Sequence, residues 1–556
     1  MENRPWLTNY PGGVPANIDT EKYNTLVEFA EDCFSKWNKK PAFQCMGKTL
    51  TFSQVDKYSK QFAGYLQSRG LQKGDKVAVM MPNLLQYPIA SFGILRAGLV
   101  AVNTNPMYTP REMKHQFVDS DVKAIVIVEN FAHNLEKIIN ETGIKIVIVA
   151  SIGEMLGSVK GAITNLMVRK VKRMVPKYNI ANTVTFKEAL SQGSKFQVSP
   201  LDGNKDDVII HQYTGGTTGV AKGAMLTNGN LVSNMLQMSA WMGKYLKEGE
   251  EVTLSPLPMY HIFAFSVNCL AMMNLGALTV LVTNPRDLKS INKEFTRNKI
   301  SLCTGINTLF NALVNNEAFN ALDFSSLKVT VGGGMAVQRA VAEKWEEVTG
   351  CRLSEGYGMT ESSPVITINP LDKTARLGSI GVPVPSTDVM ITDDNGQPVP
   401  QGEPGEIRVK GPQVMKGYYK RPDETAKTII NGWLCTGDIG KMDGDGYFQI
   451  VDRKKDMILV SGFNVFPNEI EDVIIKHPGV MEVGAIGIPH DKSGEVVKVY
   501  IVRKDDSVNP EDIVAFAKES LTGYKIPKEI EFIPELPKTN VGKILRKELK
   551  KMHNEG

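Results

Sequence analysis

Up to about residue 376, short apolar runs alternate with amphipathic segments along the chain. The apolar runs have the length of strands buried on both faces, and the amphipathic segments have the 3.6-residue period of helices. Helices that connect buried strands predict an α/β architecture with parallel sheets. We expect strands at Lys76–Met81, Ala124–Val128, Lys145–Ala150, Val208–Gln212, Thr279–Val282 and Lys328–Val331, and helices at Thr25–Trp37 and Ser53–Gly70.

The pattern changes after Arg376, where short alternating segments are separated by turn sequences such as Asp393–Gly396 and Gly402–Gly405. Alternation interrupted by Gly, Asn, Asp and Pro predicts antiparallel hairpins and therefore a β-rich part. A third turn sequence, Asp443–Gly446, has the acidic residues of a calcium loop but lacks the later glutamate, so a hairpin turn is the better interpretation.

A charged string, Asp452–Asp456, comes before the last hundred residues, which have a pattern of their own. We expect strands near Glu482–Ile488 and Val496–Arg503 and a helix near Pro510–Ser520. The sequence thus predicts a large N-terminal domain (1–452) of stacked α/β sheets with a β-rich subdomain, a hinge (453–456) and a small α+β C-terminal domain (457–556).

One stretch has to be tested as a membrane span, because Val252–Pro285 contains no Asp, Glu, Lys or Arg. A span needs about 20 apolar residues, but Pro256, Pro258 and Gly276 interrupt this one. We expect a buried unit instead, with strands at Val252–Ser255 and Leu278–Val282 and a helix at Ala264–Asn274.

Composition narrows the function classes. The chain has 556 residues, of which 42% are hydrophobic and 22% charged, which is typical of globular proteins and excludes disordered and collagen-like classes. A net charge of +4 over this length argues against a nucleic-acid binder. The six cysteines are scattered, and the first residues do not resemble a secretory signal, so we expect a reducing, cytoplasmic location.

A loop rich in Gly and Thr follows the expected strand Val208–Gln212. Glycines open backbone conformations that other residues avoid, and hydroxyl and N–H groups donate to phosphate oxygens while lysine adds charge. No Walker A frame fits this loop, and the alternative is a flexible linker. We predict a phosphate-binding loop made of Tyr213, Thr214, Gly215, Gly216, Thr217, Thr218, Gly219, Lys222 and Gly223.

This loop resembles the signature of the adenylate-forming (AMP-binding) superfamily. The resemblance continues in order through Pro258–His261, Gly332–Gly334, Glu355–Glu361, Trp433–Asp438, Asp452–Asp456 and Pro537–Lys543. Gly432–Asp438 is similar to the signature of fatty-acyl-CoA synthetases, and Met81–Pro88 is similar to the long-chain bacterial enzymes of that group. Cys435 departs from this signature, which usually has a histidine there.

The resemblance implies ATP as a co-substrate and assigns its site. The loop would hold the β- and γ-phosphates, and Glu361 with Thr214 would hold Mg²⁺, because a carboxylate beside a triphosphate needs a cation between them. Glu361 alone would otherwise be a charge at a helix N-terminus, and Asp438 a turn residue. The family's adenosine and α-phosphate contacts map to Gly332, Gly333, Gly334, Glu355, Gly356, Tyr357, Gly358, Thr360, Asp438 and Arg453.

The resemblance also implies a moving C-terminal domain. Lys543 would stabilise charge during adenylation and then leave as the domain turns at Lys455 and opens a path for coenzyme A, the second co-substrate. The alternative interpretation is that Lys543 belongs to the polar face of a terminal helix. His261 would line the adenylate or acyl pocket, or be a core histidine, and Phe265 would close an acyl tunnel. We expect Lys543, Thr360 and His261 to be the catalytic residues.

A basic segment, Val159–Tyr178, has no acidic residue and places Ile163, Met167, Val171 and Met174 on one helical face. Such a helix binds an anionic membrane surface or is an ordinary solvated helix, and both interpretations stay open. The first would put the protein at the inner face of the membrane.

Together these features predict an ATP- and Mg²⁺-dependent ligase that converts a long-chain fatty acid into acyl-CoA through an acyl-adenylate. The apolar stretch after His261 favours a long chain, because each buried methylene contributes about 0.8 kcal/mol. The alternatives are an acyl-AMP ligase that serves a carrier protein and a non-catalytic fatty-acid carrier. The oligomeric state stays open, and a homodimer is one alternative.

Overall fold

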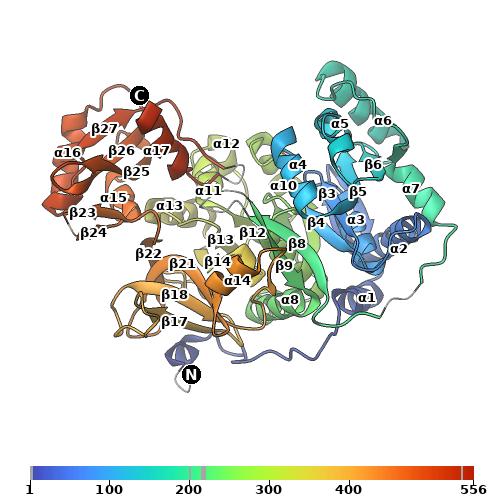
Figure 1. Cartoon of the computed structure of the whole chain (residues 1–556), viewed down its shortest axis with the longest axis horizontal. Coiled ribbons are helices and arrows are strands. Elements are labelled where there is room, and N and C mark those ends of the chain that lie inside the picture. Colours follow the sequence, from blue (N-terminus) through green and yellow to red (C-terminus); the bar gives the residue numbers. More distant parts are fainter. Residues whose placement is uncertain (1–3, 200–201, 215–220, 462, 540–541, 556) are drawn as a thin grey trace.

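The structure is a computed structural model of the chain, and it describes residues 4–199, 202–214, 221–461, 463–539 and 542–555. Four β-sheets organise these residues (Figure 1). The first two sheets carry the predicted parallel strands, the third is the β-rich part, and the fourth belongs to the end of the chain. The α/β fold class predicted from the hydrophobic pattern is therefore confirmed.

The first sheet has the order β19-β9-β8-β4-β3-β5-β6-β7. The strands β3, β4, β5, β6, β7 and β8 run parallel, whereas β9 and β19 are antiparallel to their neighbours. Their bounds are β3 Lys76–Met80, β4 Val100–Asn103, β5 Val122–Val128, β6 Ile146–Ala150, β7 Val184–Thr185, β8 Val208–Thr214, β9 Lys222–Thr227 and β19 Gly417–Tyr418.

The second sheet has the order β16-β15-β14-β13-β12-β10-β11-β1-β2 and is parallel from β14 to β1. Its strands are β1 Pro41–Cys45, β2 Lys48–Thr51, β10 Val252–Ser255, β11 Leu278–Leu281, β12 Leu302–Gly305, β13 Val329–Gly332, β14 Leu353–Gly358, β15 Val365–Ile368 and β16 Val382–Pro383.

Helices join the two sheets through one apolar core. This core draws on α1 (Leu26–Lys36), α2 (Phe52–Ser68), α3 (Gln86–Arg96), α8 (Asn228–Met242) and a π-helix, η5 (Ala264–Ala271). Thr25 and Thr51 cap the first two helices, each accepting a backbone N–H three residues on, which explains why they begin where they do. The other helices are α4 Pro110–Asp119, α5 Ala132–Glu136, α6 Ser158–Leu166, α7 Phe186–Gly193, α9 Met272–Asn274, α10 Leu288–Arg297, α11 Asn307–Val314, α12 Glu317–Asn320 and α13 Arg339–Thr349.

The third sheet is antiparallel, as the turn sequences predict. It contains β17 (Asp388–Thr392), β18 (Gly405–Lys410), β20 (Ile429–Ile430), β21 (Trp433–Met442) and β22 (Phe448–Arg453), with α14 (Pro422–Thr428) beside it. Asp443–Gly446 forms the turn between β21 and β22, as expected.

The fourth sheet forms the small red lobe at the C-terminal end in Figure 1. It contains β23 Ile458–Val460, β24 Phe463–Val465, β25 Val480–His490, β26 Gly494–Arg503 and β27 Glu529–Phe532, and its helices are α15 Pro467–Ile474, α16 Pro510–Lys518 and α17 Arg546–Glu555. This sheet has an apolar core of its own, which includes Ile470, Ile501 and Ile513. The predicted boundary near residue 453 stays a prediction, although β22 ends at this point.

Two helical segments differ from the sequence expectation. The segment Ala264–Asn274 is helical, but most of it is the π-helix η5, a rare form that often occurs at functional sites. The basic segment is shorter than expected, because α6 continues as a π-helix, η4 (Met167–Val171), and then ends. Among the helices of the described residues, none has the length and apolar character needed to span a bilayer.

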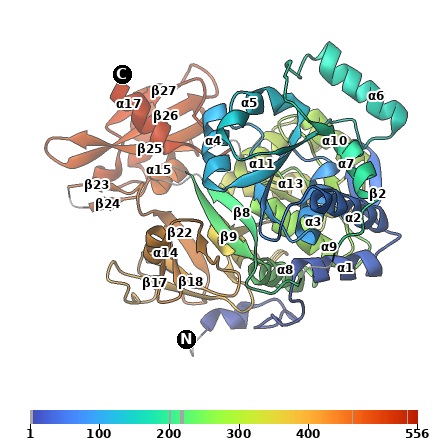
Figure 2. The ribbon, with the colours of Figure 1, turned by 45° about the vertical axis from the view of Figure 1, so that its right-hand side comes forward.

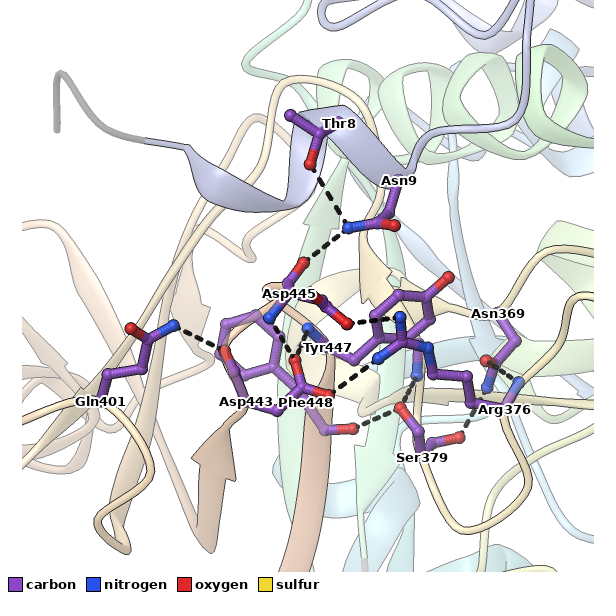
Figure 3. Close-up of polar contacts among 11 residues, drawn as sticks. Thr8, Asn9, Asn369, Arg376, Ser379, Gln401, Asp443, Asp445, Tyr447 and Phe448 are labelled. Atoms are coloured by element: carbon purple, nitrogen blue, oxygen red, sulfur yellow. Dashed lines mark hydrogen bonds and ion pairs between the residues drawn. The ribbon is translucent and has the colours of Figure 1, made fainter.

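A polar network anchors the turn between β21 and β22 (Figure 3). The Arg376 guanidinium lies 3.8 Å from the centre of the Tyr447 ring and pairs with Asp443 at 3.0 Å and Asp445 at 2.8 Å. Asn9, from the N-terminal segment, donates to the Asp445 carbonyl oxygen at 2.7 Å. The network fixes the start of β22, so the strand that leads to residue 453 is held firmly at its far end.

Candidate active site

The two ends of the predicted phosphate loop face each other across a β-hairpin. Thr214, the last residue of β8, is paired in register with Lys222, the first residue of β9. The Tyr213 ring packs over Gly223 so closely that a β-carbon there would lie 2.9 Å from it. Gly215, Gly216, Thr217, Thr218 and Gly219, also predicted for this loop, lie outside the described residues.

The carboxyl ends of β13 and β14 bring the predicted adenosine residues together. Gly332 is the register partner of Glu355, and Gly356, Tyr357 and Gly358 continue β14. In open α/β sheets this end of the strands is where ligands bind. Burial raises the pKa of Glu355 to about 8, and its Oε1 accepts the Val337 N–H at 3.2 Å.

Glycine is required at several of these positions. A β-carbon at Gly333 would lie 3.1 Å from the Gly356 carbonyl oxygen, and one at Gly358 would lie 1.9 Å from that of Pro364. Gly334 has a φ of +76°, which favours glycine. Gly333 and Gly358 thus pack against neighbouring backbone, whereas Gly334 is exposed. An exposed glycine suits contact with a flat ring such as a purine.

Asp438 links the third sheet to β14. Its Oδ2 accepts the Tyr357 hydroxyl at 2.6 Å, and its Oδ1 lies 3.2 Å from Nε of Arg453. Burial, and then the Asp438 charge, hold the pKa of Tyr357 well above its usual value, so the phenol stays protonated and donates. Asp438 therefore has a fixed orientation at the border with the C-terminal part.

Glu361 lies in a short 3₁₀ turn, η6 (Thr360–Ser362), directly after β14, and Thr360 begins this turn. Oε1 of Glu361 accepts the Tyr418 hydroxyl at 2.6 Å, and Glu361 is 6% exposed. Burial raises the pKa of Glu361, while Tyr418, Arg453 and Lys222 act in the opposite direction. These three neighbours favour the ionised form of Glu361, and a carboxylate oxygen is the ligand type that a hard cation takes.

Lys543 reaches this cluster from the other end of the chain. Burial lowers its pKa to about 8, the Arg453 charge adds to the lowering, and Asp438 and Glu361 oppose it. The preceding residue, Gly542, has a φ of +80°, and a β-carbon on it would lie 2.6 Å from Oγ1 of Thr308 in α11. The loop that carries Lys543 therefore packs against the second sheet's helices rather than extending into solvent.

His261 lies three residues before η5, and Phe265 is the second residue of this π-helix. Burial, with a smaller effect of Lys543, lowers the pKa of His261 to about 4, and its Nδ1 accepts the Phe263 N–H at 3.3 Å. The ring is therefore neutral at pH 7. Phe265 is 1% exposed and makes an edge contact with Tyr87 at 6.5 Å.

The residues around 453 form a second charged cluster. Asp452 is fully buried, and its Oδ2 accepts the Asn468 N–H of α15 at 2.8 Å. Arg546, three residues after Lys543, lies 2.8 Å from Glu471 and 3.6 Å from Asp452. Lys455 lies in the turn between β22 and β23, and burial lowers the pKa of its ammonium.

Two residues near the site were not predicted from the sequence. Tyr418 contacts Glu361, and Glu424 pairs with Lys222 at 2.7 Å. Both come from the segment between β18 and β21, far from the glycine-rich motifs in sequence. Their local signal is Gly417-Tyr418 followed by a Pro-led helix, a common pattern with little specificity.

Within the parts of the chain that the structure covers, no group of three or more His, Cys, Asp or Glu side chains forms a metal cage. A site with one carboxylate, such as Glu361, suits Mg²⁺, which usually takes one or two protein carboxylates and completes its shell with phosphates and water.

Comparison with known families decides which group of proteins this is. The AMP-binding enzyme family model matches residues 30–419, and the model of the AMP-binding enzyme C-terminal domain matches residues 469–543. The chain belongs to the AMP-binding enzyme family. The superfamily resemblance seen in the sequence is thereby confirmed.

Other AMP-binding enzymes are similar over nearly the whole chain. A protein of Escherichia coli O6:H1 named long-chain-fatty-acid–CoA ligase is 53% identical over 546 residues, which is 98% of this chain and 97% of that protein. The crystal structure of ATP-bound MatB from Rhodopseudomonas palustris has a TM-score of 0.83 and 26% identity over 96% of this chain and 99% of that one. The anthranilate CoA ligase AuaEII in complex with anthranoyl-AMP shares the fold, with a TM-score of 0.86 and 24% identity over 97% and 99% of the two chains.

Proposed function

We propose that the protein is an ATP-dependent long-chain fatty acid–CoA ligase. The observation that carries the proposal is the position of Lys543. The lysine of the C-terminal part lies within the electrostatic reach of Asp438, Arg453 and Glu361, which belong to the preceding sheets. Full-length relatives that carry this activity in their names support the choice of acid and thiol.

In the first half-reaction, a carboxylate oxygen of the fatty acid attacks the α-phosphorus of ATP. The bond to the β-phosphate oxygen breaks, which gives acyl-AMP and pyrophosphate. Both reactants are anions, so the protein has to hold them together and neutralise charge. In our assignment Thr214, Lys222 and the loop between them hold the phosphates, and Thr360 and Lys543 contact the α-phosphate as charge develops.

The adenosine part would lie between the bare backbone of Gly332–Gly334 and the Tyr357 ring. The Asp438 carboxylate would accept the ribose hydroxyls, with Arg453 beside it. Glu361 and Thr214 would hold Mg²⁺, which supplies positive charge to the phosphates when bound. Oxygen donors next to the phosphate loop fit such an ion.

In the second half-reaction, the sulfur of coenzyme A attacks the acyl carbon, the acyl–phosphate bond breaks, and AMP leaves while the thiol proton goes to solvent. We assign the required change of arrangement to a turn of the C-terminal domain (457–556) at 453–456, about Lys455. The fixed start of β22 and the buried Asp452 at its end support a hinge just beyond this strand.

The acyl chain would lie along η5, with His261 and Phe265 at its head. Every residue from Ala264 to Ala271 is buried, and the segment has no charged side chain. The neutral ring of His261 adds no charge to this surface. An apolar segment with no acidic side chain of its own suits an alkyl chain better than an amino acid.

The test is CoA-dependent thioester formation across fatty acids of increasing length. Fatty-acid-dependent exchange of labelled pyrophosphate into ATP should accompany it, because adenylation is reversible. Exchange without thioester formation would instead indicate an acyl-AMP ligase, and the absence of both activities would indicate a carrier.

We also propose that α6 and η4 contact the cytoplasmic face of an anionic membrane. This segment projects from the large domain in both views (Figures 1 and 2). Its apolar side chains are unusually exposed, with Val159 at 71%, Ile163 at 57% and Val171 at 63%. Lys170, Lys172, Arg173 and Lys177 are exposed beside them. Apolar side chains flanked by cations complement anionic lipid.

A further inference from the structure

Tyr418 contacts both charged groups of the phosphate site through different parts of one side chain. Its hydroxyl donates to Oε1 of Glu361 at 2.6 Å, and the ammonium of Lys222 lies 4.9 Å from the centre of its ring. Glu424, from α14, holds the same ammonium at 2.7 Å. Tyr418 itself is 7% exposed, so its ring has little freedom to move.

The backbone around Tyr418 is tied to both partners. Strand β19 pairs with β9, with Tyr418 opposite Ala224 and therefore two residues from Lys222. The Tyr418 N–H donates to Oγ1 of Thr425 at 2.8 Å, and the Met415 N–H donates to the Glu361 carbonyl oxygen at 2.8 Å. These bonds set the distance between the phenol and the carboxylate.

Glycine at position 417 makes this approach feasible. Gly417 has a φ of +144°, and a β-carbon there would lie 2.7 Å from Cγ2 of Thr425. A side chain would push β19 away from α14 and move Tyr418 with it. The local chain is thus built for close packing at this point.

The hydrogen bond from Tyr418 restricts the orientation of the Glu361 carboxylate. A glutamate side chain has three rotatable bonds, and a metal site works best when its ligands are held in place before the ion arrives. A phenol that donates to Oε1 fixes the carboxylate plane and leaves Oε2 for a cation. The aromatic face, in turn, favours one position of the lysine ammonium.

We propose that Tyr418 is a positioning residue that orients Glu361 toward the cation of the nucleotide and Lys222 toward its phosphates. The inference rests on the proposed function, since it requires that ATP bind at this loop. Tyr418 itself touches neither the reacting carboxylate nor the α-phosphate in this scheme, so it acts through Glu361 and Lys222.

Tyr418→Phe is the decisive variant, because it keeps the ring over Lys222 and removes only the donor to Glu361. The probe is ATP titrated by calorimetry, once with Mn²⁺ present and once with EDTA. We expect the affinity in Mn²⁺ to fall about tenfold, as is common when a charged group loses a hydrogen bond. Affinity in EDTA should stay within about twofold, because the contact of Lys222 with the ring remains.

The matched control is Tyr419→Phe, the next residue, whose hydroxyl donates to Asp121 at 2.9 Å and not to Glu361. This variant should keep the wild-type ratio of the ATP affinity in Mn²⁺ to the ATP affinity in EDTA. In a Glu361→Gln background, adding Tyr418→Phe should change neither affinity further, because an amide at position 361 no longer supplies the carboxylate ligand that the phenol orients. Thermal midpoints verify that each variant is folded. If Tyr418→Phe does not fold, Tyr418→Met takes its place in the Mn²⁺ titration only, because it also removes the ring over Lys222.

Two results would overturn the inference. One is a folded Tyr418 variant whose ATP affinity in Mn²⁺ equals that of the wild type. The other is a tenfold loss of ATP affinity in Mn²⁺ when Tyr418→Phe is added to Glu361→Gln. Failure of wild-type protein to bind ATP under both conditions would instead refute the proposed function. The two failures are therefore distinguishable.

Discussion

At the residue scale, the chemistry of Lys543 depends on its surroundings more than on its own structure. In the sequence it is one of several lysines near the C-terminus, next to Lys547, Lys550 and Lys551. In the folded chain its neighbours are Arg453, Asp438 and Glu361, and burial lowers its pKa. These neighbours make it the candidate for stabilising charge at the α-phosphate.

Lys543→Ala should reduce fatty-acid-dependent pyrophosphate exchange by about 100-fold or more, the usual loss when a preorganised donor to a transition-state charge is removed. Thioester formation from supplied acyl-AMP should remain near the wild-type rate. Lys547→Ala, an exposed lysine on α17, is the control and should leave both rates unchanged. Equal loss of both half-reactions in Lys543→Ala would refute the assignment.

The pKa of Lys543 leads to a pH prediction. Burial lowers it to about 8, so the ammonium needed for adenylation is present below that pH and is lost above it. The kcat/KM for ATP, which reports the free enzyme, should therefore fall as pH rises through about 8. In Lys543→Arg the residual activity should lack this fall, because guanidinium stays charged. If the fall in kcat/KM at high pH persists unchanged in Lys543→Arg, a group other than Lys543 causes it.

At the element scale, α6 and η4 leave large apolar side chains uncovered. A helix in a soluble domain normally turns this face to a core, and its cations then face water. Here Leu166 is 59% exposed, and Met174, three residues beyond the end of η4, is 50% exposed. Arg169 pairs with a buried carboxylate, that of Glu129, at 2.8 Å. Charge variants should therefore leave Arg169 in place.

Changing Lys170, Lys172, Arg173 and Lys177 to Ser should lower the partition constant for phosphatidylglycerol vesicles, measured by sedimentation, by up to about a thousandfold, since each basic residue near an anionic surface contributes about 1 kcal/mol. Phosphatidylcholine vesicles should show little binding of either protein. The matched control removes four exposed lysines from the opposite end of the molecule, Lys504, Lys518, Lys528 and Lys547. Wild-type sedimentation of the first variant would leave α6 as a solvated helix.

At the scale of the whole molecule, the C-terminal part has to occupy two positions in the proposed cycle. In the present arrangement Arg546 bridges Glu471 and Asp452, and Gly542 packs on Thr308. The contacts of Arg546 with Asp452 and of Gly542 with Thr308 join the C-terminal part to the rest of the chain, and we assign this arrangement to adenylation. The proposed turn at residues 453–456 has to break the contact of Gly542 with Thr308 while the chain between the two parts stays continuous.

Lys455→Pro should allow pyrophosphate exchange and stall thioester release, because proline fixes φ at about −65° and blocks the turn. The single-turnover yield of acyl-AMP should approach the wild-type value while steady-state acyl-CoA formation falls more than tenfold. Lys455→Ala, which leaves φ free, is the control. Undiminished turnover in the proline variant would place the hinge elsewhere.

The limits of prediction from sequence follow from the range of each signal. The strand Val252–Ser255 was predicted with its observed bounds, because a buried strand leaves a local apolar run. The helix after it was predicted without its π geometry, since periodicity over a few turns does not separate the two forms. Tyr418 and Glu424 were missed because their partners, Glu361 and Lys222, lie 57 and 202 residues away.

The sequence alone thus determined the α/β class and the hairpin-rich part, because both depend on local periodicity and turn residues, and its motifs, taken in order, resemble those of the AMP-binding family. Only the tertiary structure decided how Tyr418 holds Glu361, why His261 is neutral and which charged residues surround Lys543. The physical reason is that orientation and protonation depend on burial and on charges contributed by distant parts of the chain.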